Sequence, residues 1–198
     1  MKMLLAAILL AGAASWSAQE KGRFEPRPVT EYPARQTVDK VTIAVEPYED
    51  SEKLKQAFGK SDPSKFGILP VLVVIANDSD RVLQLERMRV QFITADRQTA
   101  DSIPAEDIHR SGRVKPPDIG GGSRFPGIKR GPKKPKDEWE ITAREFVAPM
   151  IPPGGNAHGF FYFRVGKGRV RDSSVYITGL RDARTGQDLL YFEIPVGK

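Results

Sequence analysis

The residues best placed to bind a ligand are the basic ones of one segment, residues 110–136 (RSGRVKPPDIGGGSRFPGIKRGPKKPK), called here the basic segment. From position 109 to 136, nine Lys and Arg residues stand against one acid, so this stretch carries +8 while the whole chain carries +6. Such a cluster attracts anionic envelope surfaces or an acidic protein. The apolar residues Phe125 and Ile128 lie directly beside these charges and are suited to entering a membrane interface. The candidate binding residues are Arg110, Arg113, Lys115, Arg124, Phe125, Ile128, Lys129, Arg130, Lys133, Lys134 and Lys136.

The residue types that usually hold metals or activate nucleophiles do not form a recognisable set. The two histidines, His109 and His158, lack the spacing of a zinc site. No G-x-S-x-G motif marks a nucleophilic serine. Residues 77–80 (NDSD) carry four oxygen-bearing side chains, but they lack the length and the closing Glu of an EF-hand and are typical of a turn. We therefore expect no catalytic residue, no metal and no cofactor.

Carboxylates and glycines leave one alternative open. Asp101, Glu106 and Asp107 lie in a connecting segment where we expect them to be solvated. Sugar hydrolysis needs two carboxylates that face each other across a cleft, so the alternative to a binding protein is an envelope hydrolase that uses carboxylates converging in the folded domain. The glycines at 120–122 are flanked by prolines and lack the strand and helix that a phosphate-binding loop requires.

The N-terminus has the three parts of a secretory signal peptide. Lys2 supplies the positive end, residues 4–14 form an apolar run, and small residues follow, so cleavage is expected after Ala14 or Ala18. The run is shorter than the about 20 residues that span a bilayer. We expect an exported protein, periplasmic or extracellular, with no transmembrane segment in the mature chain. Export argues against nucleic acid as the target of the basic segment. The chain has no cysteine, which excludes a lipoprotein anchor and disulfides.

Hydrophobic patterns in the first half predict short strands and one inserted helix. Residues 19–37 are polar with three prolines and are predicted to form an extended leader with little to bury. A strand is predicted over 38–45, and an amphipathic helix over 48–60 with Leu54, Ala57 and Phe58 on one face. The run at 67–76 predicts a fully buried strand with a proline near its start. An amphipathic strand over 88–94 and one helical turn over 104–110 follow.

The second half continues with strands after the basic segment, which we expect to be a mobile loop. Strands are predicted over 139–147, 158–165, 173–180 and 189–196, separated by turn residues such as Pro-Pro-Gly-Gly at 152–155. The alternation within these strands predicts which side chains are buried. The expected core contains Val73, Ile75, Val90, Phe92, Phe161, Phe163, Ile177 and Tyr191.

Seven or so short strands separated by turns favour an all-β protein, an antiparallel two-sheet β-sandwich with one short inserted helix and a long basic loop. The stretches 67–94 (GILPVLVVIANDSDRVLQLERMRVQFIT) and 151–196 resemble secreted bacterial immunoglobulin-like (Ig-like) sandwich domains. The shared features are an apolar strand ending in Asn-Asp, a Pro-Gly-Gly turn before an aromatic strand, and a Thr-Gly turn before the last strand. The resemblance implies a fold and no activity. We expect a signal peptide over 1–18, a leader over 19–37 and a single domain over 38–198.

These expectations combine into one functional hypothesis. An exported Ig-like domain without a catalytic set is expected to be a non-catalytic binding or assembly module of the cell envelope. Its partner is expected to be an acidic envelope protein or an anionic envelope surface, bound through the basic segment.

Overall fold

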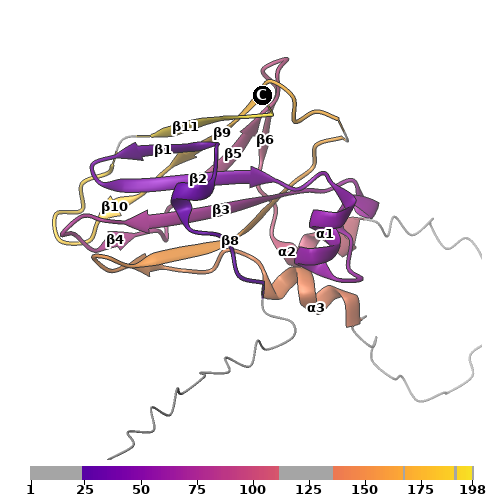
Figure 1. The fold of residues 1–198 in the computed structure, drawn as a ribbon, viewed down its shortest axis with the longest axis horizontal. Coiled ribbons are helices and arrows are strands. Elements are labelled where there is room, and N and C mark those ends of the chain that lie inside the picture. The colour runs from indigo at the N-terminus through magenta and orange to yellow at the C-terminus, as the bar shows by residue number, and fades with distance from the viewer. Residues whose placement is uncertain (1–23, 112–135, 167, 190, 198) are drawn as a thin grey trace, which may run out of the picture.

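The structure is a computed structural model, and it describes residues 24–111, 136–166, 168–189 and 191–197. The expected signal peptide and most of the basic segment therefore lie outside the described residues. The described part is mostly β, with antiparallel strands in three sheets (Figure 1). This agrees with the all-β class expected from the sequence.

Two four-stranded sheets make up most of the fold. One has the order β1-β2-β3-β8, the other β11-β9-β5-β6, and a small third sheet has the order β10-β4-β7. The strands are β1 (Arg35–Val38), β2 (Val41–Pro47), β3 (Leu69–Asn77), β4 (Leu83–Gln84), β5 (Arg89–Ile93), β6 (Thr99–Asp101), β7 (Met150–Ile151), β8 (Asn156–Phe163), β9 (Ser173–Thr178), β10 (Arg181–Asp182) and β11 (Phe192–Val196).

The central strand β3 is buried on both of its faces. Its odd-numbered residues, such as Val73, join a core cluster that also contains Phe92 and Ile177 of the second four-stranded sheet. Its even-numbered residues, such as Leu72 and Val74, join a second cluster beneath the helices. Burial on both sides explains why residues 67–76 are continuously apolar instead of alternating.

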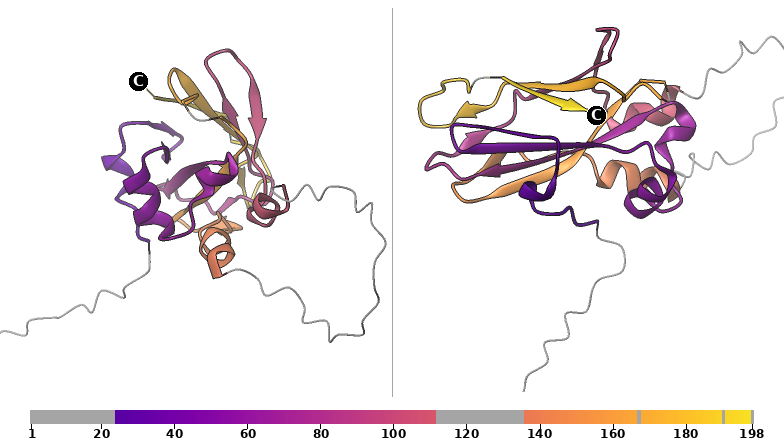
Figure 2. Two further views of the ribbon diagram at one scale, coloured as in Figure 1. Left: turned by 90° about the vertical axis from the view of Figure 1, so that its right-hand side faces the viewer. Right: turned by 45° about the horizontal axis from the view of Figure 1, so that its top comes forward.

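The helices gather at one end of the molecule and cover the other face of the sheet β1-β2-β3-β8 (Figures 1 and 2). They are α1 (Ser51–Phe58), α2 (Ala105–Ser111) and α3 (Lys136–Ala143), together with the short 3₁₀ turn η2 (Pro63–Phe66), while the 3₁₀ turn η1 (Val29–Glu31) lies against β2 and β3. The helix predicted over 48–60 is confirmed in α1, which buries Leu54, Ala57 and Phe58. Asp50 caps it by accepting hydrogen bonds from two amides of the first turn.

The N-terminal part of the described chain differs from the expected leader. Tyr32 is only 1% exposed, and β1 pairs with β2 through a turn at Asp39 and Lys40. Both turn residues have positive φ, 49° and 63°, as a two-residue hairpin loop requires. The strand predicted over 38–45 corresponds to β2, and β1 lies almost wholly in residues expected to be leader. The sequence did not reveal the hairpin, because its turn uses Asp-Lys where Asn-Gly or Asp-Gly would have signalled it.

The strand predicted over 139–147 is wrong, because these residues begin within helix α3. Lys, Glu and Ala favour a helix there, and Ile141 anchors it in the core beneath the helices. The chain then runs beside β8, where the amide of Phe160 donates to the carbonyl of Arg144 at 2.8 Å and the amide of Phe146 donates to the carbonyl of Phe160 at 3.1 Å. This segment covers the edge of β8.

Most of the expected core is confirmed. Val73, Ile75, Val90, Phe92, Phe163 and Ile177 are all at most 2% exposed. Phe161 is half-buried and stacks on Phe146. The expectation for Tyr191 is wrong: it is 54% exposed, because it precedes β11, whose inward side chains start at Phe192.

Candidate functional site

The two ends of the basic segment lie together at the helical end of the molecule, meaning α1, α2, α3 and η2. Helix α2 ends at Ser111 and α3 begins at Lys136, and each helix contributes a fully or nearly fully buried isoleucine, Ile108 and Ile141, to the same cluster. The hydroxyl of Tyr162 donates to the carbonyl of Ile141 at 2.7 Å. The sheet therefore holds both helices, and through them the start and finish of the basic segment.

The structure describes the backbone of only two of the candidate binding residues. Arg110 lies in α2 and Lys136 is the first residue of α3. The other candidates lie outside the described residues. They are Arg113, Lys115, Arg124, Phe125, Ile128, Lys129, Arg130, Lys133 and Lys134.

Next to the basic segment, α3 presents an aromatic side chain that the sequence analysis did not single out. Trp139 is 74% exposed, and Phe66 of η2, at the same helical end, is 43% exposed. Tryptophan in such a position is typical of a binding surface, since it is rarely left in water without a partner. Its position three residues after the basic segment was visible in the sequence, but the strand predicted there concealed its place on a helix.

Hydrogen bonds from both sides fix the position of α3 and the residues after it. Glu140 accepts a hydrogen bond from the Ser61 hydroxyl at 3.1 Å, and Glu145 accepts one from the Ala105 amide at the start of α2 at 3.1 Å. The Arg144 guanidinium lies over the ring of Phe24, 5.4 Å from its centroid. Burial lowers the pKa of Arg144 from its ordinary value. These contacts make the helical end a defined support for the basic segment.

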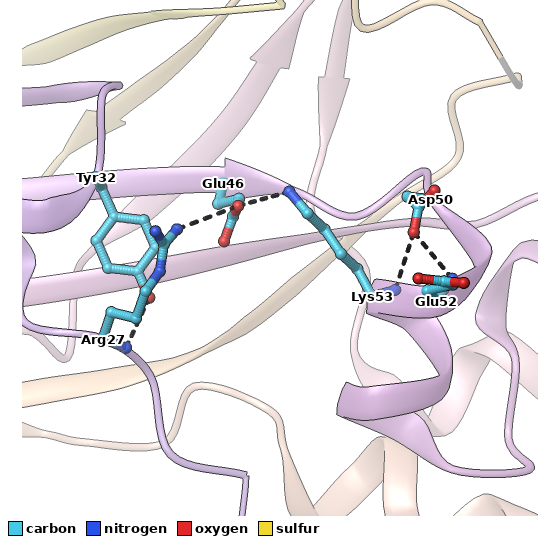
Figure 3. Close-up of polar contacts among 6 residues, drawn as sticks. All are labelled: Arg27, Tyr32, Glu46, Asp50, Glu52 and Lys53. Carbon is cyan, nitrogen blue, oxygen red and sulfur yellow. Dashed lines mark hydrogen bonds and ion pairs between the residues drawn. The ribbon is translucent and has the colours of Figure 1, made fainter.

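A polar cluster ties the start of the described chain to β2 and α1 (Figure 3). Glu46 lies between the guanidinium of Arg27 at 3.5 Å and the ammonium of Lys53 at 2.8 Å. The backbone amide of Arg27 donates to the Tyr32 hydroxyl at 3.1 Å, and its guanidinium lies 4.6 Å from the centre of that ring. Burial, strengthened by the charge of Glu46, raises the pKa of Tyr48. These contacts join the N-terminal segment to β2 and α1, so we assign this cluster a structural role.

A hollow of about 360 Å³ beside β10 brings the carboxylates Asp80 and Asp182 to one place. One oxygen of Asp182 accepts the backbone amides of Arg184 at 2.8 Å and Thr185 at 3.2 Å. These amides hold the pKa of Asp182 below its ordinary value. One carboxylate oxygen of Asp182 is therefore engaged by two amides of its own turn, which is the geometry of a turn cap.

The turn at residues 77–80 is also built to stabilise the fold. Asn77 is fully buried, and its side-chain amide donates to the carbonyls of Arg81 at 2.7 Å and Ile151 at 3.2 Å. Its side-chain oxygen accepts from the amide and hydroxyl of Ser79. The expectation that this motif is a turn is confirmed.

Three further results complete the description of the site. Within the described ranges, no three His, Cys, Asp or Glu side chains gather in a group that could hold a metal ion. Among the helices of the same residues, none has the length and apolarity needed to cross a membrane. The chain matches no protein-family model, and no curated protein matches it.

Proposed function

We propose that this chain is an exported, non-catalytic binding or assembly module of the bacterial cell envelope, and that its basic segment binds an acidic partner protein. The observation that carries the proposal is the packing of α2 against the same core as α3, through Ile108 and Ile141. It fixes both ends of a segment carrying +8 at one end of the domain. Long loops held by a rigid scaffold are where binding residues concentrate.

The choice of an acidic protein rests on the residues that flank the basic segment. Trp139, 74% exposed, stands three residues beyond it. Tryptophan and arginine are the residue types that dominate binding energies at protein interfaces, and positive charge steers an acidic partner toward them. Outside the basic segment the chain is mildly acidic, so the attraction is local.

An Ig-like antiparallel sandwich, carrying its binding element on a loop, is the fold we propose for this module. The support is a core cluster that combines inward side chains of both four-stranded sheets, such as Val73 with Phe92 and Ile177. The hydrolase alternative has less support, because the carboxylate of Asp182 in the hollow beside β10 accepts hydrogen bonds from two backbone amides of its own turn.

The proposal is tested with the mature chain, used to retain proteins from envelope extract over a range of salt concentrations. We expect an acidic envelope protein to be retained at low salt and released as salt rises, since exposed charges are screened within about 8 Å at physiological ionic strength. Changing Lys129, Arg130, Lys133 and Lys134 to Gln should abolish retention. A matched control removes four exposed charges elsewhere and should retain the partner: Lys40→Gln, Lys55→Gln, Arg87→Gln and Arg171→Gln.

Two further measurements decide between the outcomes. Replacing residues 112–135 with a Gly/Ser linker of about eight residues should leave the melting temperature within a few degrees, because closure entropy changes slowly with loop length. Binding to vesicles of phosphatidylglycerol without retention of any acidic protein would move the target to an anionic envelope surface. Equal retention by the basic-segment variant and the control variant would refute the proposal.

A further inference from the structure

The outer face of the sheet β11-β9-β5-β6 presents an ordered row of side chains. Glu193 lies opposite Tyr176, Tyr176 opposite Gln91, and Gln91 opposite Asp101, so four strands each contribute one residue. The neighbours of these residues along the strands, such as Val175, are buried in the core. Because side chains alternate along a strand, the row points away from the core. The helices lie beyond the other sheet, so they do not cover this face.

Two tyrosines form an aromatic platform on this face. The rings of Tyr176 and Tyr191 are 5.4 Å apart between centroids and inclined by 35°. Tyr191 is 54% exposed, so its ring remains accessible although the neighbouring Phe192 is fully buried. Two inclined rings, one exposed and one half-buried, offer an apolar surface bordered by hydroxyl groups. We call this face, with its row of polar side chains, the tyrosine face.

The polar residues beside the tyrosines are held in place by their own hydrogen bonds. The side-chain amide of Gln91 donates to Asp101 at 2.7 Å, and the hydroxyl of Ser174 donates to Glu193 at 3.4 Å. The backbone amide of Glu193 donates to the side chain of Gln36 on β1 at 2.9 Å. This last bond occupies an edge amide of β11, so a ligand is offered side chains here instead of a free strand edge.

A hollow of about 380 Å³ extends the tyrosine face toward the edge strand β6. It is lined by Met88, Arg89, Val90, Gln91, Asp101 and Ser102. This volume lies within the range of about 300–1,000 Å³ that is usual for small-ligand sites. Gln91 and Asp101 belong both to the hollow and to the row that contains Tyr176, so the hollow borders the tyrosine face on its β6 side.

We propose that the tyrosine face binds a neutral oligosaccharide. One side of a pyranose ring carries C–H groups that stack on an aromatic ring, while its hydroxyls both donate and accept hydrogen bonds. Tyr176 and Tyr191 supply the aromatic surface. Gln91, Asp101 and Glu193 supply an amide and two carboxylates, groups that pair with adjacent hydroxyls.

Other ligand classes fit this face less well. A nucleic acid needs several cations to neutralise its phosphates, whereas the row and hollow combine Arg89 with two carboxylates, Asp101 and Glu193. The centre of a protein interface is depleted in charged residues, whereas here charged side chains stand directly beside the tyrosines. A polyhydroxylated, uncharged chain satisfies both the aromatic and the polar groups.

This inference adds a ligand, a neutral oligosaccharide, to the proposed envelope-binding function. The oligosaccharide binds the tyrosine face, which is a different surface from the basic segment.

The test measures binding of the mature chain to three soluble probes by NMR titration: hexamers of β-1,4-glucose, α-1,4-glucose and N-acetylglucosamine. We expect at least one probe to bind. Tyr191→Ala should weaken its binding about tenfold, while Tyr191→Phe, which keeps the ring, should bind within about twofold of the unmodified chain.

Further variants make the outcome unambiguous. Gln91→Ala should also weaken binding while leaving the melting temperature nearly unchanged, because this side chain is not in the core. The basic-segment variant, with four Lys and Arg changed to Gln, should bind the glycan as the unmodified chain does, which separates this proposal from the previous one. Failure of all three probes to bind would overturn the inference, and so would binding that survives the combined Tyr191→Ala and Gln91→Ala substitutions.

Discussion

Gly159, in the middle of β8, lies where another part of the chain crosses the strand with no space for a side chain. A Cβ placed on Gly159 would lie 2.7 Å from the backbone nitrogen of Phe146, 2.8 Å from its Cβ and closer still to its Cα. Real Cβ atoms essentially never approach other heavy atoms closer than 3.0 Å. The obstructing atoms are mostly backbone, so they cannot move aside by a rotamer change.

The expected cost of Gly159→Ala follows from what must move. Overpacking a filled site costs about 1–3 kcal/mol. The displacement also strains two backbone hydrogen bonds, from Phe160 to Arg144 and from Phe146 to Phe160, each worth about 1 kcal/mol. We therefore expect Gly159→Ala to lower the free energy of unfolding by about 2–4 kcal/mol. At about 2–4 °C per kcal/mol for a domain of this size, the melting temperature should fall by roughly 4–16 °C.

A second glycine provides a matched control for this experiment. A Cβ on Gly166 would meet nothing within 4 Å, and φ at Gly166 is not in the left-handed region. Gly166→Ala should therefore leave stability unchanged or raise it by up to about 1 kcal/mol, through the lower entropy of the unfolded chain. Both variants are compared by urea unfolding monitored by circular dichroism. If Gly159→Ala unfolded at the same urea concentration as Gly166→Ala, the path of residues 144–146 beside β8 would be wrong.

Three further perturbations test other parts of the fold. Phe92→Ala should cost about 3–5 kcal/mol in urea unfolding, and Tyr191→Ala less than about 1 kcal/mol, because Phe92 is fully buried while Tyr191 is 54% exposed. Equal losses would mean that their positions are misassigned. Asn77→Ala should cost about 1–3 kcal/mol, because it leaves the buried carbonyl of Ile151 without this donor, and a smaller loss would show that another group replaces the amide. Asp182 has a lowered pKa in the folded state, so its contribution is present above the ordinary carboxyl pKa of about 3.9 and disappears as pH falls through its folded value. The melting temperature of Asp182→Asn should therefore fall less on acidification than that of the unmodified chain, and parallel curves would contradict this assignment.

The parts of the fold that the sequence predicted are those in which local pattern and tertiary burial agree. Residues 67–76 are continuously apolar, and β3 is buried on both faces. Helix α1 has an Asp at its start, a Gly at its end and one apolar face, and each of these signals is used in the structure. In both cases a few neighbouring residues contain all the information needed to identify the element.

The parts that the sequence did not predict depend on contacts between distant residues. The segment 139–147 alternates apolar and polar residues well enough to suggest a strand, yet α3 forms because Ile141 enters the core beneath Tyr162. The chain after α3 can pass close to β8 because Gly159 has no side chain. Residues 139–147 themselves do not indicate that a glycine lies opposite them. The turn at Asp39 and Lys40 was missed for a more local reason, since neither residue is the glycine that usually marks such a turn.

The two proposed sites differ in the kind of information that reveals them. The charge of the basic segment can be counted from the sequence, because its residues are contiguous and charge needs no fold to be recognised. The tyrosine face joins Gln91 and Asp101 to Tyr176 and Glu193, residues up to about a hundred positions apart, and only strand register places them in one row. Strand register does not show which of these side chains are accessible to a ligand, and the exposed fraction of each side chain does. Tyr191, expected in the core, remains accessible beside Tyr176, so the residue whose burial was wrongly predicted is the one that makes this face a candidate ligand site.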